Sequence, residues 1–207
     1  MESNLRKIIH LAHNSERREP RFQLPDGSVI FVRQPSNEEI DHLYELSKTE
    51  ISDSVAPLDL VKAVYKHNSD SIWGVYYTRA NSPENVRFIG YYAFLHLNDV
   101  GRLALEKGTF DPVEPTLEQL APEGERPIVV YIWAIVAKKV ARVATPLVAK
   151  ALGKDRYGGV PIYTSAATLG GLNTIKSYDF VNVQPSKMGL GDLFRLDGDG
   201  PEAAPAA

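Results

Sequence analysis

The hydrophobic pattern of the chain is most regular over residues 128–152. Residues 128–137 form a nearly continuous apolar run of β-branched and aromatic side chains, which predicts a buried strand. The apolar positions that follow recur at helical spacing and share one face: Val143, Leu147, Val148, Ala151 and Leu152. A short basic turn joins the two segments. It is either an ordinary strand–helix connection with solvated lysines or an anion site, typically for phosphate, because first-turn helix amides lack partners and carry the positive end of the dipole.

The pattern before this segment predicts two hairpins separated by two helices. Pro25-Asp26-Gly27 lies between the apolar runs 21–24 and 29–33, which is typical of a hairpin turn. Ser36 with Glu39 predicts a capping box at the start of a helix, and Pro57 opens a second helix. Residues 71–78 and 86–97 are then expected to form an antiparallel pair of strands.

Residues 98–127 depart from this pattern, and we interpret them as a structured insertion with short helices near 98–107 and 115–120, because their hydrophobic side chains need burial. Strands are expected at 160–165, 178–183 and 191–196, with a helix over 168–177. We therefore predict an N-terminal helix and linker over 1–20, a domain over 21–197 and a loose tail over 198–207.

Composition narrows the class of protein. The 207 residues suffice for one sizeable core, and the net charge of −3 without a long basic block argues against nucleic acid as the main partner. The absence of cysteine excludes disulfides and thiolate nucleophiles, and the five scattered histidines make a metal site unexpected. No segment has the length of a membrane span, and residues 1–11 lack the continuous apolar core of a signal peptide, so we expect a cytoplasmic protein.

Four local motifs carry a resemblance to a known family: Phe88-Ile89-Gly90-Tyr91-Tyr92-Ala93, the segment 132–147, Thr164-Ser165-Ala166-Ala167, and the segment 175–181. In this order they resemble the GNAT superfamily of acyl-CoA-dependent N-acyltransferases, over about residues 29–196. The resemblance implies an α/β (α+β) fold: a mixed, mostly antiparallel central sheet flanked by helices, with the insertion before the cofactor-binding strand.

The resemblance also implies a site for acetyl-CoA or another acyl-CoA, used as co-substrate, on the backbone of the strand end and the following turn. The implied residues are Trp133, Ala134, Ile135, Val136, Ala137, Lys138, Lys139, Val140, Ala141, Arg142, Val143, Ala144 and Thr145. An ungapped match to the family's Gln/Arg-x-x-Gly-x-Gly/Ala loop places Arg142 at the first glycine. Pro146 is compatible with a first helical turn, which predicts a helix that begins at Thr145 or slightly earlier.

Acyl transfer to an amine needs a base, an oxyanion donor and an acid for the leaving thiolate. The candidate bases are His96, which could face an acceptor cleft, and Glu125 with its neighbour Glu123. The candidate acids are Tyr163 and Tyr178, because the family's usual tyrosine position is occupied by Ile175. Each of these side chains also has an ordinary structural explanation, as a surface charge, a core histidine or a packed aromatic ring.

Tyr131, Trp133 and Tyr92 are the candidate substrate-binding residues. Alternation along a strand places Tyr131 and Trp133 on one sheet face, and Ile132 with Ala134 on the other.

The leading hypothesis is an N-acyltransferase that moves an acetyl or longer acyl group from acyl-CoA to a primary amine of a small molecule or a protein. Two alternatives stay open: a GNAT-like domain that binds acyl-CoA or another ligand without catalysis, and a synthase that takes acyl groups from a carrier protein to make an N-acyl amino acid or signal. In the last case the insertion would cover an acyl tunnel or dock the carrier. The sequence leaves the acceptor and the chain length undetermined, and a homodimer through the edge of the closing strands stays open.

Overall fold

The computed structural model describes residues 19–51, 55–137, 139–184 and 191–197. In chain order the first half contains β1 (Arg21–Gln23), β2 (Val29–Arg33), α2 (Asn37–Glu50), α3 (Leu58–His67), η1 (Ser69–Ser71), β3 (Ile72–Arg79) and β4 (Ser82–Leu97). The second half contains α4 (Asp99–Glu106), η2 (Leu117–Gln119), β5 (Val129–Val136), α5 (Ala141–Leu152), α6 (Lys154–Tyr157), β6 (Ile162–Ser165), α7 (Leu169–Lys176), β7 (Val181–Gln184) and β8 (Leu193–Leu196).

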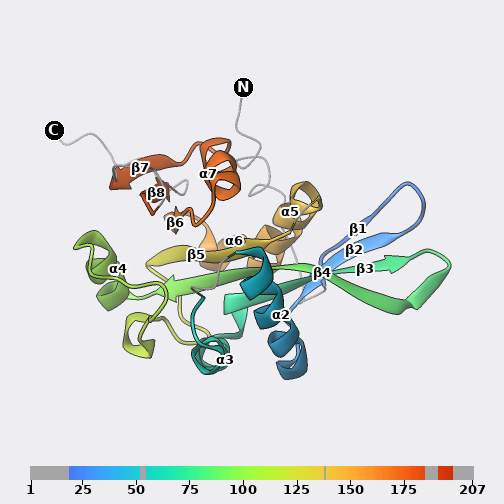
Figure 1. Ribbon diagram of the computed structural model, residues 1–207, viewed down its shortest axis with the longest axis horizontal. Helices are drawn as coiled ribbons and strands as arrows, with labels where there is room; N and C mark the ends of the chain where they lie inside the picture. Colours follow the sequence, from blue (N-terminus) through green and yellow to red (C-terminus); the bar gives the residue numbers. More distant parts are fainter. Residues whose placement is uncertain (1–18, 52–54, 138, 185–190, 198–207) are drawn as a thin grey trace.

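The described strands form one eight-stranded sheet in the order β1-β2-β3-β4-β5-β6-β8-β7 (Figure 1). The pairing of β5 with β6 is parallel, and the other neighbouring pairs are antiparallel. This confirms the predicted fold class, a mixed and mostly antiparallel sheet flanked by helices. The central position of β5 follows from its apolar sequence, because a strand covered on both faces has no solvated side.

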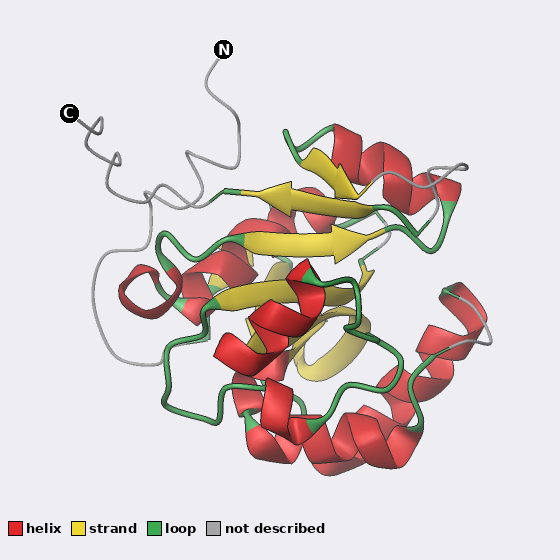
Figure 2. Ribbon diagram, turned by 90° about the vertical axis from the view of Figure 1, so that its left-hand side faces the viewer, coloured by secondary structure: helices red, strands yellow, loops and turns green. Residues whose placement is uncertain are grey.

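Helices pack on both sides of the strands (Figure 2). On one face, Ala144, Leu147 and Val148 of α5 pack against side chains of β2, β3, β4 and β5. On the other face, Ile40 and Leu43 of α2 pack against β3, β4 and β5, and residues of α3 and α4 form a neighbouring cluster with the first half of β5. Two hydrophobic layers therefore enclose the sheet, as a three-layer α/β arrangement requires.

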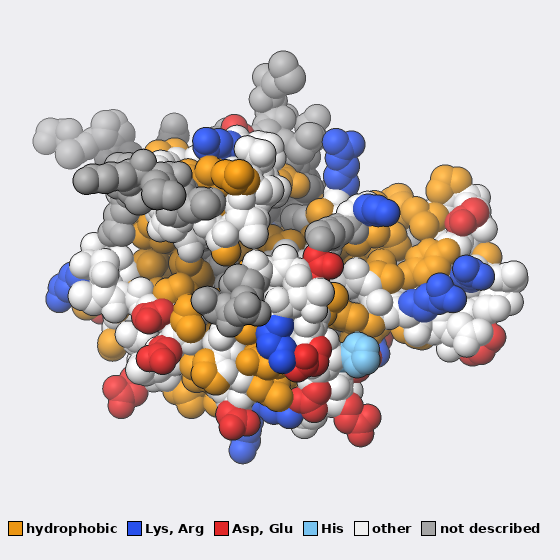
Figure 3. Space-filling view, in the orientation of Figure 1, with side chains coloured by type: hydrophobic (Ala, Val, Ile, Leu, Met, Phe, Trp, Pro, Cys, Tyr) orange, Lys and Arg blue, Asp and Glu red, His pale blue; other side chains and the backbone are white. Residues whose placement is uncertain are grey.

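The β1–β2 and β3–β4 hairpins extend beyond the helices as an arm (Figure 1). On the face shown in Figure 3, hydrophobic side chains are exposed along this arm, while Lys and Arg side chains are dispersed rather than gathered in one stripe. Phe22 and Val86 are each nearly half exposed. A homodimer through the closing strands stays a prediction.

The local sequence signals behave as expected in the described residues. Gly27 adopts a left-handed φ of 80° in the β1–β2 turn, where the Ser28 amide donates to Asp26 Oδ1. Ser36 and Glu39 form both hydrogen bonds of the capping box of α2. Residues 98–127 contain α4, η2 and connecting segments, and their status as an insertion stays a prediction. The predicted helix over 3–13 and the tail over 198–207 lie outside the described residues.

Candidate functional site

The second half of β5 has a neighbouring strand on one side only. Its parallel ladder with β6 consists of Val130↔Ile162, Tyr131↔Tyr163 and Ile132↔Thr164, whereas its antiparallel ladder with β4 continues to Val136. Among the described residues, no strand pairs with the segment from Trp133 to Val136 on the β6 side, so backbone groups there have no ladder partner. Ile135 within this segment is 44 % exposed although it belongs to a central strand. We call this segment the open edge of β5.

A β-bulge shapes the open edge. Ala93 of β4 pairs with Ala134, but the next residue, Phe94, pairs with Ile132, so Trp133 is an extra residue on β5. The bulge shifts the alternation of side chains by one position. Ala134 consequently lies on the same face as Trp133, which corrects the prediction that Ala134 shares the opposite face with Ile132. The bulge carries no sequence signature that alternation alone could reveal.

Helix α5 begins at Ala141, one turn before the predicted start at Thr145, and this prediction was wrong. Pro146 is therefore inside the helix rather than in its first turn. Its ring nitrogen cannot donate to the Arg142 carbonyl, so that helical bond is missing. Arg142, the second helical residue, extends into solvent, and its backbone does not need the freedom of the family's first glycine.

The turn before α5 is built around Lys139, which has a left-handed φ of 67° although it is not glycine. The N-cap Val140 has no polar side chain with which to accept the first-turn amides. The amides of Val143 and Ala144 donate to the Val140 carbonyl at 3.0 and 2.9 Å, and the Val140 amide donates to Ala137. No acceptor among the described residues bonds the amides of Lys139, Ala141 or Arg142, so the expected anion site narrows to these three amides.

Two cationic side chains lie at this helix start: Lys139 and Arg142 are both exposed. Lys138, the third predicted cation, lies outside the described residues. The combination of unpaired amides, the positive helix end and two cations is suited to a phosphate group.

Tyr92 is 2 % exposed and lies on the α5 face of the sheet, where its hydroxyl is 2.8 Å from Thr145 Oγ1. Burial raises the pKa of Tyr92 to about 12, the bond to Thr145 lowers it, and the nearby Tyr178 phenol adds to the rise. Tyr92 is not part of the cavity wall described below, so its predicted role in substrate binding is replaced by a role in holding α5 beside the open edge.

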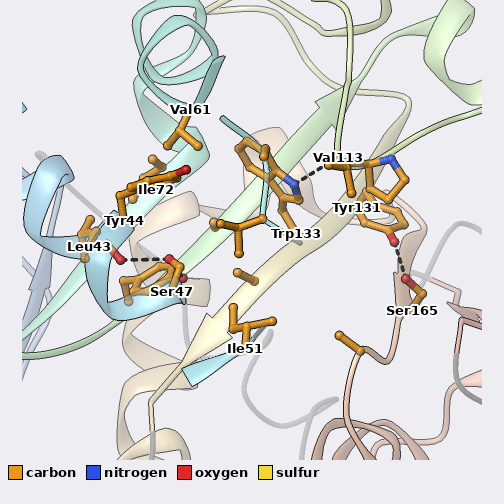
Figure 4. A pocket seen from close by; sticks show the side chains of 17 residues that line it. Leu43, Tyr44, Ser47, Ile51, Val61, Ile72, Val113, Tyr131, Trp133 and Ser165 are labelled. Carbon is orange, nitrogen blue, oxygen red and sulfur yellow. Dashed lines mark hydrogen bonds between the residues drawn. The ribbon is translucent and has the colours of Figure 1, made fainter. Parts of the chain in front are cut away.

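A cavity of about 240 Å³ lies on the opposite face, next to the open edge (Figure 4). Its floor is the sheet, through Tyr91, Ala93, Tyr131, Trp133 and Ala134. Helices α2 and α3 supply one wall, which includes Leu43, Ser47 and Val61, and Ser165 with Ala167 supply the wall after β6. Pro112 and Val113 of the insertion complete it, and the lining side chains that the structure describes are all uncharged.

The polar groups of this wall are bonded to one another. The Tyr131 hydroxyl lies 2.6 Å from Ser165 Oγ, and the Trp133 indole nitrogen donates to the Pro112 carbonyl at 2.7 Å. Ser47 bonds both to the Leu43 carbonyl and to the Tyr91 hydroxyl. Tyr131 and Trp133, two of the predicted substrate-binding residues, thus lie together in the cavity floor, as Figure 4 shows.

The two candidate acids have different surroundings. Tyr163 is buried in the cluster that contains Tyr131 and Leu193, two residues before the cavity residue Ser165. Tyr178 follows α7 and is half-buried, and its phenol acts electrostatically on Tyr92. Ile175, at the family's usual tyrosine position, is buried against Leu172 and Phe194.

Neither predicted base lies in the cavity. His96 is 1 % exposed and stacks with Phe94 and Tyr157 on the α5 face, because alternation along β4 places it on the side of Tyr92. Burial lowers the pKa of His96 to about 3, with the positive charge of Arg156 acting in the same direction. Glu125 is exposed before the start of β5, eight residues from Trp133, and its carbonyl accepts from Arg156. The expectation that His96 faces an acceptor cleft was wrong.

Sequence reasoning missed the cavity residues contributed by α2, α3 and the insertion. These positions carry ordinary apolar side chains, and only the tertiary fold brings Leu43, Val61 and Val113 to one place. Ser165 belongs to one of the four sequence motifs. Its hydrogen bond to Tyr131 could not be predicted from the motif, because it depends on the pairing of β5 with β6.

The described part of the chain contains neither a candidate metal-binding cluster nor a candidate membrane-spanning helix. No group of three or more His, Asp or Glu side chains there could hold a metal ion. None of the helices described has the length and apolar character needed to cross a membrane.

No protein-family model and no curated protein sequence matches this chain. Solved structures do match. The GNAT domain of S. lividans PAT is 12 % identical and aligns over 89 % of this chain and 99 % of its own, with a TM-score of 0.50. An acetyltransferase of the GNAT family from Staphylococcus aureus Mu50 is 10 % identical over 81 % of this chain and 98 % of its own, with a TM-score of 0.48. A histone acetyltransferase HPA2-related protein from Corynebacterium glutamicum is 14 % identical over 79 % of this chain and 92 % of its own, with a TM-score of 0.38.

At these identities the likeness concerns the fold alone. The chain has the GNAT fold.

Proposed function

We propose that the chain is an N-acyltransferase that moves an acetyl or longer acyl group from acyl-CoA to a primary amine of a small molecule or a protein. The observation that carries the proposal is the open edge of β5, which lies between an anion-suited helix start and an uncharged cavity. A ligand with a diphosphate at one end, an amide-containing arm and an acyl group at the other end matches these three features in order.

In this proposal the backbone of Trp133, Ile135 and Ala137 pairs with the amide groups of the pantetheine arm, as an added strand would. The diphosphate lies on the Ala141 and Arg142 amides, with the Lys139 and Arg142 side chains as further donors. The Tyr92–Thr145 bond fixes the start of α5 relative to the sheet. The diphosphate site on α5 and the open edge of β5 therefore keep a constant separation.

The chemistry consists of attack by an unprotonated amine on the thioester carbonyl, loss of a proton from the attacking nitrogen to water, collapse of the tetrahedral intermediate and departure of the thiolate, which takes up a proton from the acid. We propose Tyr178, which follows the family's usual tyrosine position at Ile175 by three residues, as the proton donor, and keep Tyr163 as the alternative. Tyr178→Phe should lower kcat with little change in KM for acyl-CoA, while Tyr163→Phe should leave kcat near the unmodified value. The reverse result would assign the role to Tyr163. Positioning of the two substrates supplies most of the acceleration.

Two measurements test the proposal. Calorimetric titration with CoA and acetyl-CoA should give saturable binding, and release of free thiol from acetyl-CoA should depend on an added amine. Arg142→Ala should weaken CoA binding by up to about fivefold, the upper range for an exposed ion pair. Lys150→Ala, a matched loss of charge at the far end of α5, should leave it unchanged. No binding of either ligand would refute the proposal.

The second candidate is a GNAT-like domain that binds acyl-CoA without catalysis. The buried Ile175 at the position of the family's usual acid favours it, because this side chain cannot donate a proton. Saturable CoA binding with no thiol release over a broad panel of primary amines would select this candidate over the transferase.

A further inference from the structure

The cavity beside the open edge is larger than an acetyl group requires. Its volume of about 240 Å³ corresponds to about eight water molecules at ~30 Å³ each. An acetyl group carries a single methyl beyond its carbonyl, so most of this space would stay unfilled. The cavity opens to solvent on one side, and concave pockets lined mainly by hydrophobic and aromatic side chains are usual sites of ligand binding.

The wall of the cavity suits hydrocarbon. All of its described side chains are uncharged, and the hydroxyls of Tyr131 and Ser165 bond to each other. The Trp133 indole nitrogen donates a hydrogen bond to the Pro112 carbonyl. The Ser47 hydroxyl bonds to the Leu43 carbonyl and to the Tyr91 hydroxyl. Most of the lining surface is apolar, so burial of a hydrocarbon chain there is favourable, whereas a polar group would replace only part of its hydrogen bonds to water.

The position of the cavity connects it to the acyl group. Trp133 and Ala134 belong both to the open edge and to the cavity floor, because the bulge turns both side chains to the same face. A thioester carried along the open edge therefore reaches the cavity at its own acyl end. Val61 and Val113 lie across from Trp133, where they limit how far a chain can extend (Figure 4).

We propose that this cavity receives the hydrocarbon chain of a medium-length acyl group, so that the preferred donor is an acyl-CoA longer than acetyl-CoA. The proposal rests on the proposed function, since it assumes that acyl-CoA binds at the open edge. It adds the donor class: straight, saturated chains up to about eight carbons, with the insertion as the part of the chain that closes the cavity.

The test is a calorimetric titration with CoA and with acetyl-, butyryl-, hexanoyl- and octanoyl-CoA. Affinity should rise about fourfold for each methylene that enters the cavity and level off near eight carbons. Val61→Phe and Val113→Phe, on opposite walls, should each reduce the affinity ratio of octanoyl-CoA to CoA by about tenfold, the equivalent of one to two methylenes. Val86→Phe, the same change at an exposed position of β4 outside the cavity, should leave the ratio unchanged.

The outcomes separate the two proposals. CoA binding with no dependence on chain length overturns the acyl-chain proposal and leaves the proposed function standing. A flat acyl series together with tighter binding of longer alkylamines, sensitive to Val61→Phe, also overturns it and assigns the cavity to the acceptor.

Absence of CoA binding refutes the proposed function itself, and 1-octanol then tests the cavity directly. The Trp73→Phe substitution leaves Trp133 as the remaining tryptophan, so that its fluorescence can be followed alone. Octanol should change this fluorescence, and adding Val61→Phe should abolish the change. No such change overturns the assignment of the cavity to hydrocarbon.

Discussion

Gly90 of β4 lies directly against the carbonyl oxygen of Val136, the last residue of β5, at a separation that leaves no room for a side chain on residue 90. This contact sets the end of the open edge, because β4 can follow β5 to Val136 only where a backbone without Cβ permits it. The Phe-Ile-Gly-Tyr-Tyr motif recognised in the sequence thus has a steric cause.

Gly90→Ala should destabilise the protein by about 1–3 kcal/mol, the usual range for overpacking, and should weaken CoA binding because Val136 must move. Urea unfolding measures the first effect and calorimetry the second. Gly170→Ala is the matched control. The nearest atom to its new Cβ is Thr168 Oγ1 at 3.9 Å, and alanine in a helix gains up to about 1 kcal/mol over glycine. A Gly90→Ala protein as stable as the unmodified one would contradict the account.

Pro146→Ala should stabilise the protein by about 2 kcal/mol. An interior proline costs a helix ~3 kcal/mol, and the greater freedom of the unfolded alanine chain returns up to about 1 kcal/mol of this. The substitution restores the bond from residue 146 to the Arg142 carbonyl in α5. Thermal unfolding measures the change. A loss of stability would show that the proline ring makes contacts that outweigh the missing bond.

His96→Phe should stabilise the protein by about 1–2 kcal/mol, because neither ring nitrogen of His96 has a hydrogen-bond partner among the described residues and phenylalanine keeps the stacking with Phe94 and Tyr157. The pH dependence of acyl transfer should be unchanged, since His96 lies on the face away from the cavity. Loss of the acidic limb of the pH–rate profile, where the rate rises as a base loses its proton, would restore His96 as a candidate base.

Glu39 should contribute a pH-dependent part of the stability. Its hydrogen bonds from Arg33 lower its pKa from 4.5 to about 2, opposed by burial and assisted by the Ser36 amide. Because the folded pKa lies below the unfolded one, this contribution is present above about pH 5 and is lost as the pH falls toward 2.

At pH 7, Glu39→Gln should cost about 1–2 kcal/mol, a value reduced for partial exposure to solvent, and the difference from the unmodified protein should shrink toward pH 2. Urea titrations from pH 2 to pH 7 measure it. Glu45→Gln, in an exposed pair on the same helix, is the control and should show almost no effect. If Glu39→Gln lowers the free energy of unfolding by the same amount at every pH, the link between the pKa of Glu39 and stability is contradicted.

The elements that follow from local chemistry were predicted from the sequence. The Pro-Asp-Gly turn, the Ser36–Glu39 capping box and the apolar strand at 129–136 each depend on neighbours within a few residues. The fold class followed from the resemblance that the order of these elements and four local motifs bear to the GNAT superfamily.

The errors have a different origin. The bulge at Trp133 depends on a register between β4 and β5, and the early start of α5 depends on a left-handed Lys139 that sequence preferences disfavour. The cavity wall joins Val61, Val113 and Ser165, which are more than 50 residues apart and carry no motif. His96 was placed wrongly because its type suggested chemistry, although alternation with Tyr92 and Phe94 on β4 already placed it on the α5 face.

The most direct test of the central claim is hydrogen exchange of the backbone amides with and without CoA. The account predicts slower exchange in residues 133–137 and 139–142 when CoA is bound, with no change in the exposed hairpin of β1 and β2. Binding of CoA that leaves exchange at 133–137 unaltered would contradict the claim that the open edge of β5 holds the pantetheine arm.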